Sequence, residues 1–205
     1  MATATRWLEE LRYLSETVAV VDRFRQWGYT IYRTGYKPSS DQQWERLLLK
    51  IQTQAYENAL RVTGATENDP NFQQIWSLFR LDARSDPALA GLDMYQLRLL
   101  YRKSEEGVAP MNADLRSHRF FRVADDQVLS DTDIFIVKCV AADFETVDNV
   151  SRDPQRVPQR YFGWMLMRAG QIVELWKDLE DRDLSELAPP TIGGSHLVVW
   201  ENISY

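Results

Sequence analysis

The stretch Trp27-Gly-Tyr-Thr-Ile-Tyr-Arg33 decides the fold that we expect for this chain. Aromatic and β-branched residues of this kind favour a β-strand. Alternate side chains of a strand point to the same face, so the side chains at the odd positions from 27 to 33 should share one face of a sheet. An amphipathic stretch over residues 41–62 follows and ends before Gly64, which predicts a helix directly after the strand.

A second segment, Phe162-Gly-Trp-Met-Leu-Met-Arg-Ala-Gly170, aligns without a gap to residues 27–35, and each copy precedes a helix that carries a Trp. Self-similarity of this kind can report a duplication. A match this short also arises by chance from strand composition, so both origins stay open. If the copies are equivalent, their faces match, and Phe162, Trp164, Leu166 and Arg168 lie together on the face that corresponds to the odd positions of the first copy.

The rest of the chain adds further strands and helices of mixed order. Strands are expected at 75–82, 117–124, 133–142, 160–168 and 196–202, and helices at 5–25, 41–62, 93–103 and 170–179. Two strand–helix units with antiparallel additions predict an α+β ferredoxin-like α/β plait, pseudo-duplicated if the repeat is real. Its sheet would be mostly antiparallel, with helices on one face and the two motif strands as central neighbours. We expect one domain over 1–205, with an N-terminal helical arm at 1–26 and the core at 27–205.

Composition excludes several classes of protein. The net charge is −6 and the basic residues are scattered, so no nucleic-acid partner is expected. Cys139 is the single cysteine, so no internal disulfide can form, and its apolar neighbours predict a buried thiol. We find no secretory signal at the start and no apolar run of the ~18 residues that a membrane span needs. A cytoplasmic protein with no membrane partner is therefore expected.

Signatures of metal or cofactor chemistry are also missing. His118 and His196 lie far apart in the sequence and share no short ligand spacing with each other or with Cys139. No Gly-x-Ser-x-Gly nucleophile motif occurs, and Gly193-Gly194 lacks the residues of a phosphate-binding loop. We therefore expect neither a metal nor a cofactor.

Aromatic residues, Met and Arg form the grouping that most resembles a ligand pocket, because such sites are mostly apolar with a few polar groups. The candidates for catalysis are Arg33, His118 and Arg160. The candidates for substrate binding are Tyr32, Tyr161, Trp164, Met165, Met167 and His196. Core packing explains any single one of these residues equally well. We place the site on the uncovered face of the sheet or where that face meets the polar loop at 145–158, a candidate lid.

Several motifs resemble those of an uncharacterised protein family that is common in filamentous fungi. These are WGYTIYRT from Trp27, MNADLRSHRFF from Met111 and QRYFGWM from Gln159, with Ile192-Gly-Gly-x-His-Leu197 near the end. The resemblance covers most of residues 27–200 and implies a fungal, cytosolic protein, without an established activity or catalytic residues to carry over. Fungi use small cofactor-free proteins with plait or cone folds as cyclases and isomerases in secondary metabolism, which is an analogy at the level of the fold.

Two functions from different classes agree with these observations. In the first, the chain is a cofactor-independent isomerase, cyclase, pericyclase or lyase of fungal secondary metabolism. It would hold a small apolar molecule with a carbonyl or carboxylate in an aromatic and Met-lined cavity, where Arg33, His118 or Arg160 would polarise the carbonyl. In the second, it is a non-catalytic binding or interaction protein, for example a homodimer formed through an exposed sheet face or the N-terminal helix.

Overall fold

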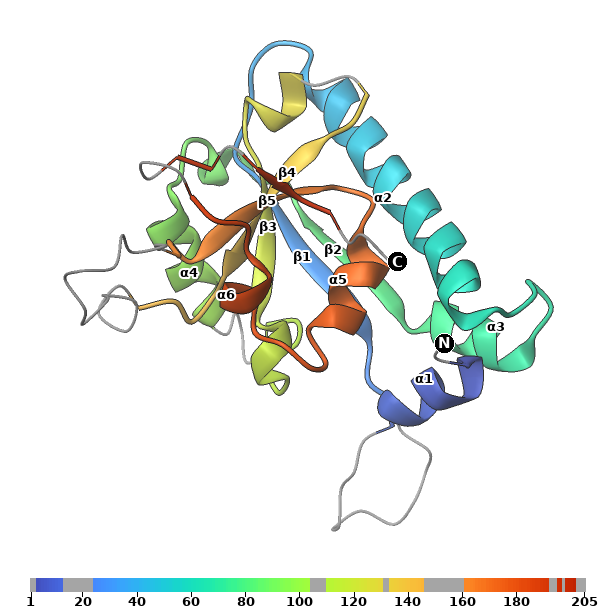
Figure 1. Ribbon diagram of the computed structural model, residues 1–205. Helices are drawn as coiled ribbons and strands as arrows, with labels where there is room; N and C mark the ends of the chain where they lie inside the picture. Colours follow the sequence, from blue (N-terminus) through green and yellow to red (C-terminus); the bar gives the residue numbers. More distant parts are fainter. Residues whose placement is uncertain are drawn as a thin grey trace.

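The structure, a computed structural model, describes residues 3–12, 24–103, 110–130, 133–145, 161–191, 195–196 and 198–201. Its centre is a six-stranded mixed sheet with the strand order β2-β1-β3-β4-β5-β6 (Figure 1). The strands are β1 (Trp27–Arg33), β2 (Phe79–Arg84), β3 (Phe120–Ala124), β4 (Ile136–Ala141), β5 (Trp164–Arg168) and β6 (Val199–Trp200).

The helices surround this sheet, and most begin or end at residues that favour a helix end. They are α1 (Ala4–Glu10), α2 (Ser40–Thr63), α3 (Pro70–Ser77), α4 (Met94–Arg102), α5 (Ile172–Asp178) and α6 (Leu184–Leu187), with 3-10 turns η1 (Pro87–Leu89), η2 (Arg116–His118) and η3 (Val128–Ser130). Asp93 and Gln96 form a capping box at the start of α4, and Gly64 ends α2 in a left-handed conformation. Within the described ranges, none of the helices has both the length and the apolar character needed to cross a membrane.

The strand β1 is buried along its whole length. It pairs in parallel with β2 on one edge and with β3 on the other, and all seven of its residues are buried. Trp27, Tyr29 and Ile31 belong to one hydrophobic core, whereas Tyr32 belongs to a second core. The alternation expected along residues 27–33 is therefore confirmed.

The main core lies between the sheet and the helices α1, α2, α3 and α5. Trp27 is the centre of its aromatic cluster, because its ring lies 4.8 Å from Trp7, 4.7 Å from Phe79 and 6.0 Å from Trp176. Such rings bury large areas, so this cluster contributes much of the hydrophobic stabilisation. Cys139 also lies in this core, where burial raises the pKa of its thiol to about 12, as expected for an inert cysteine.

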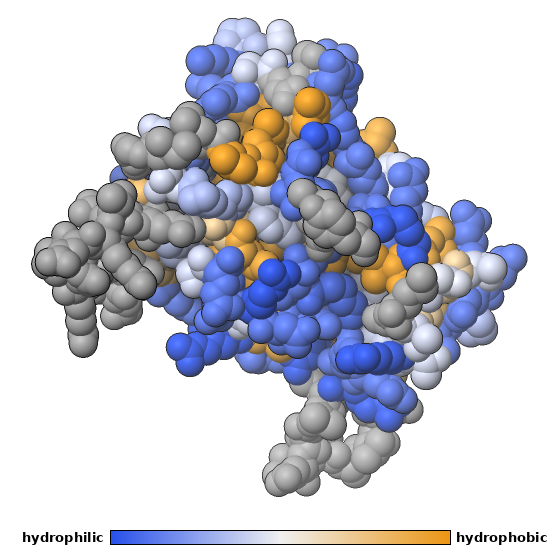
Figure 2. Space-filling view, in the orientation of Figure 1, coloured by the Kyte–Doolittle hydropathy of each residue, from blue (hydrophilic) through white to orange (hydrophobic). Residues whose placement is uncertain are grey.

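The second core lies on the opposite face of the sheet, beneath α4 (Figure 1). It contains Tyr32, Leu97, Tyr101, Phe121 and Val140. The expectation that helices cover one face only is wrong, because β1 and β3 carry large apolar side chains on both faces and each face needs a cover. In the view of Figure 2, apolar side chains reach the surface near β4.

The sheet agrees with the expected α+β class but does not confirm the ferredoxin-like plait. Of the five strand pairings described, β1–β2, β1–β3 and β5–β6 are parallel, so the expected mostly antiparallel sheet is wrong. The motif strands β1 and β5 are not neighbours, because β3 and β4 lie between them. The strand expected at 75–82 begins as α3, and the chain then enters β2 at Phe79, parallel to β1.

Equivalent side chains of the two motif copies lie on opposite faces of the sheet. Met165 and Met167 point into the main core, whereas Trp164 packs against the second core. The gap-free alignment equates Trp164 with Tyr29, which lies in the main core, so the expected matching faces are wrong. A shift of one residue moves every side chain of a strand to the other face. The described strands therefore give no support to a duplication.

The N-terminal helix is shorter in the described residues than the sequence predicts. A helix was expected over 5–25, and α1 spans Ala4–Glu10, while residues 13–23 lie outside the described ranges. Trp7 and Leu8 of α1 pack into the main core, which means that this helix is docked on the domain.

Replacing Tyr29 with Phe should destabilise the protein by about 1 to 2 kcal/mol. The Tyr29 hydroxyl donates a buried hydrogen bond of 2.9 Å to the Ile172 carbonyl, which joins β1 to the start of α5. The matched control is Tyr36→Phe, because the Tyr36 hydroxyl donates to the Asp86 carbonyl at an exposed position where water can take its place. Urea unfolding of the two variants would contradict this assignment if their losses were equal.

Candidate functional site

A pocket of about 280 Å³ lies between the segment before β5, the helix α6 and the segment before β6. Its walls are Tyr161, Ser185, Glu186, Ala188, Pro189, Thr191 and His196. The short helix α6 contributes Ser185 and Glu186, and a capping box between Asp183 and Glu186 starts this helix. The pocket is mixed in character, with aromatic, small apolar and hydroxyl-bearing residues in its wall.

Two buried polar atoms in the wall of this pocket are unsatisfied. The Tyr161 hydroxyl and the His196 Nε2 atom have no hydrogen-bond partner within the described part of the chain. Burial raises the pKa of the Tyr161 phenol and lowers the pKa of the His196 imidazole, so both groups are neutral near pH 7. An unsatisfied buried polar group costs roughly 1–3 kcal/mol, which a ligand with complementary groups could recover.

The imidazole of His196 is held by aromatic rings. It stacks on Trp164 with ring centroids 3.5 Å apart and an angle of 27° between the planes, and Phe162 lies edge-on at 6.1 Å. Three of the predicted binding residues, Tyr161, Trp164 and His196, therefore come together around this pocket.

Arg98 of α4 binds the backbone at the end of β4 and in the segment that leads from Tyr161 into β5. Its Nε donates to the Ala141 carbonyl at 2.9 Å, and its Nη2 donates to the Gly163 carbonyl at 3.0 Å. The same guanidinium lies 5.2 Å from the Phe144 ring centroid, and Phe144 meets Tyr161 edge-on at 5.6 Å. Arg98 of α4 thus helps to position the Tyr161 ring through Phe144 and the backbone at Gly163.

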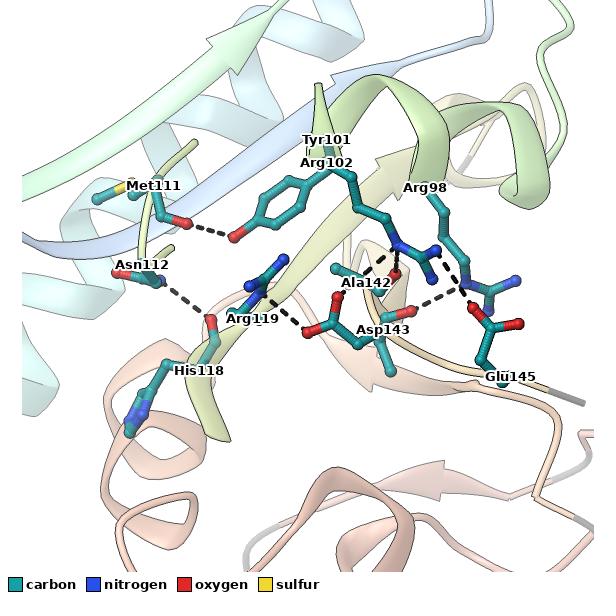
Figure 3. A network of polar contacts seen from close by, with 11 residues as sticks. Arg98, Tyr101, Arg102, Met111, Asn112, His118, Arg119, Ala142, Asp143 and Glu145 are labelled. Atoms are coloured by element: carbon teal, nitrogen blue, oxygen red, sulfur yellow. Dashed lines mark hydrogen bonds and ion pairs between the residues drawn. The ribbon is translucent and has the colours of Figure 1, made fainter. Parts of the chain in front are cut away.

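Arg98 belongs to a wider polar network at the end of β4 (Figure 3). Arg102 donates to the Ala142 carbonyl at 2.8 Å and to the Glu145 carboxylate at 3.2 Å. Asp143 lies between two arginines and forms ion pairs with Arg119 at 2.9 Å and with Arg102 at 3.7 Å. Carboxylates neutralise Arg102 and Arg119, and Arg98 donates to backbone carbonyls, so we assign the network to holding α4 on the sheet.

Arg33, a predicted catalytic residue, lies where β1 meets the start of α2. Its guanidinium donates to Ser40 Oγ at 2.7 Å and to the Gly35 carbonyl at 3.0 Å, and it forms an ion pair with Asp41. It also covers the Tyr36 ring at 4.4 Å. These contacts join β1 to α2, and Arg33 does not line the pocket described above.

His118, the second predicted catalytic residue, has hydrogen-bond partners at both ring nitrogens. Its Nε2 lies 3.0 Å from the Trp176 carbonyl, and its Nδ1 lies 3.0 Å from Ser117 Oγ. Its ring also contacts the Trp176 indole at 4.1 Å. The histidine therefore links η2 to α5 and lines neither the pocket beside Tyr161 nor the pocket beside Lys138.

The other candidates fall into three places. Met165 and Met167 are buried in the main core, and Tyr32 meets Phe121 edge-on at 5.3 Å in the second core. Arg160 and most of the expected loop at 145–158 lie outside the described residues. The aromatic and Met-lined cavity expected from the sequence is thus not formed by the two methionines.

Sequence reasoning missed Arg98, Ser185 and Glu186. The sequence of residues 180–188 suggests an acidic turn. However, Asp183-x-x-Glu186 has the spacing of a capping box, which could have predicted the helix α6. Arg98 carries no comparable local signal. In the described ranges, no group of three or more His, Cys, Asp or Glu side chains could hold a metal ion.

Replacing Gly163 with Ala should destabilise the protein and disturb the pocket. Gly163 has a φ of 77°, and a Cβ atom there would overlap the Phe144 ring and Arg98 Nη2. Gly64→Ala is the matched control, since Gly64 has a φ of 62° and open space around a Cβ. We expect both variants to lose about 1 kcal/mol of unfolding free energy because Ala is strained at a positive φ. Gly163→Ala should lose about 1 to 3 kcal/mol more, because its Cβ atom overlaps neighbouring side chains. Equal losses in thermal or urea unfolding would contradict the close packing at Gly163.

His118 should make the protein less stable in mild acid. Burial lowers the pKa of its imidazole from 6.5 to about 4, despite the hydrogen bond to the Trp176 carbonyl. The unfolded chain therefore takes up a proton below pH 6.5, whereas the folded chain does so only near pH 4. Stability should fall as the pH drops through this window, by on the order of 3 kcal/mol in total.

The measurement is urea unfolding of wild type and His118→Gln at several pH values. Gln does not titrate, so the difference in unfolding free energy between wild type and the variant should change between pH 6.5 and 4. Above pH 6.5 this difference should stay constant. Parallel curves across the window would show that His118 titrates normally in the folded protein.

Comparison with known proteins yields no relative: no protein-family model matches the chain, and no significant similarity to a curated protein or to a solved structure was found.

Proposed function

We propose that this protein is a cofactor-independent enzyme of the isomerase type, which binds a small neutral carbonyl compound in the pocket beside Tyr161 and His196. The observation that carries the proposal is that both side chains line one pocket and each holds a buried, unsatisfied polar atom. Pockets with a few convergent polar groups and shifted pKa values are the usual places of function.

The chemistry follows from the two neutral groups. The Tyr161 hydroxyl would donate a hydrogen bond to the carbonyl oxygen and stabilise the negative charge that develops there. The neutral His196 Nε2 would take a proton from the carbon that lies between the carbonyl and a C=C bond of the substrate. It would return this proton to the far carbon of the double bond, so that the C=C bond moves into conjugation with the carbonyl. The proton and the electrons of the broken C–H bond stay within the system, so no cofactor is needed.

The surroundings favour this pair in two further ways. Trp164 stacks on His196, and an indole face stabilises an imidazolium when the proton arrives. Glu186 lines the same pocket, and its carboxylate would repel an anionic substrate. We therefore propose a neutral β,γ-unsaturated ketone, aldehyde or ester as the substrate, and the carboxylate that the sequence analysis also allowed is not part of this proposal.

A non-catalytic binding protein is the alternative, and it would use the same pocket without turnover. Fungal origin, a role in secondary metabolism, cytoplasmic location and homodimer formation stay predictions that rest on the sequence.

The experiment is proton exchange of two ketones, acetophenone and β-tetralone, in D₂O, followed by NMR. Wild type should accelerate deuteration next to the carbonyl. Tyr161→Phe and His196→Gln should each reduce this rate by a factor of about 10² or more, which is typical for a lost acid–base group. Tyr36→Phe, a change away from the pocket, should retain the full rate.

Two outcomes would decide against the proposal. If the ketones broaden in the presence of wild type but do not exchange faster, the site binds without catalysis. If His196→Gln exchanges protons as fast as wild type, His196 is not the base.

A further inference from the structure

A second pocket, of about 230 Å³, opens on the face of the sheet that carries the second core. Its walls are Gln127, Val128, Ile136, Lys138 and Leu166. Lys138 and Leu166 are cross-strand partners in β4 and β5, and they lie half-buried, whereas Val140 on the same face is fully buried under α4.

Lys138 places a cation in this apolar wall. Its side chain is 22% exposed, and its ammonium forms an ion pair with Asp125, whose side chain is 24% exposed. The Lys138 Nζ atom also lies 5.9 Å from the centroid of Trp164. An ammonium carries three N–H donors, and Asp125 is its one hydrogen-bond acceptor within the described ranges. Donors therefore remain for a ligand.

Asp125 is fixed in place by the start of η3. Its Oδ1 accepts from the backbone N–H groups of Gln127 and Val128, both at 3.1 Å. The carboxylate thus neutralises Lys138 from a rigid position, and a second carboxylate at the ammonium would lie close to a like charge. A neutral acceptor, such as a carbonyl oxygen, would gain the hydrogen bond without this repulsion.

We infer that this pocket is a second ligand site, which takes a neutral molecule with an apolar body and a carbonyl acceptor. The apolar body would pack on Val128, Ile136 and Leu166, and the carbonyl would accept from Lys138 Nζ. The site stands next to Trp164 but shares no wall residue with the pocket of Tyr161 and His196. It is therefore independent of the proposed isomerase activity.

The test uses octanamide and octanoate, which have nearly the same shape but differ in charge. Backbone amide shifts of ¹⁵N-labelled protein give both the affinity and the location. Octanamide should shift the amides of Gln127, Ile136 and Leu166, and it should bind wild type more tightly than octanoate does. Lys138→Met keeps the length and the apolar contacts of the side chain but removes the ammonium. It should lower the affinity for octanamide about tenfold, which corresponds to the loss of a hydrogen bond to a charged donor.

Two further variants separate the possible explanations. Asp125→Asn removes the negative charge that repels a carboxylate. It should therefore raise the affinity for octanoate severalfold relative to the affinity for octanamide. His196→Gln, in the other pocket, should leave octanamide binding unchanged. The inference is overturned if octanamide does not bind, if Lys138→Met binds it as tightly as wild type does, or if octanoate binds wild type more tightly than octanamide.

Discussion

The rest of the structure depends on the complete burial of β1. A strand with a parallel neighbour on each edge and no exposed residue leaves none of its polar groups to water, so each needs a partner inside the protein. Thr30 donates to Asp82 of β2, Arg33 donates to Ser40 of α2, and the Gly28 carbonyl accepts from the Asn112 amide at 2.9 Å. Burial of both faces also requires two layers of cover, which α2 and α4 provide from opposite sides.

Local patterns in the sequence were sufficient to predict the helices α2 and α4 and the alternation along β1. These features depend on neighbours within a few residues, such as the capping box of Asp93 and Gln96 or the stop at Gly64. Strand partners depend on the whole chain, and a period of two says nothing about which strands meet. The match of Trp164 with Tyr29 shows the limit, because similar residues at equal spacing lie on opposite faces of the sheet.

The candidate site could be predicted in part, for a similar reason. Tyr161 and His196 line the candidate pocket and Trp164 stacks on His196, in agreement with the expectation that aromatic side chains gather in pockets. Arg33 and His118 have equally suitable chemistry, but their polar groups are engaged by α2 and α5, which only the tertiary structure reveals. Arg98 and the wall from α6 could not be found from composition, since their role comes from contacts between distant segments.

Buried polar atoms without partners therefore say more about function than residue type does, provided that their surroundings are considered. Arg122 is fully buried and its Nε has no partner among the described residues, but its other nitrogens donate to the Ala169 carbonyl at 2.8 Å and to Met167 Sδ at 3.3 Å. The Trp7 indole N–H also lacks a partner in the part of the chain that the structure describes, yet Trp7 is packed in the main core and lines neither described pocket. For Tyr161 and His196, an unpaired atom coincides with a pocket that a ligand can enter. An unsatisfied buried polar atom costs stability until a ligand supplies its partner, so two such atoms in the wall of one pocket are the reason for placing the proposed site there rather than at Arg122 or Trp7.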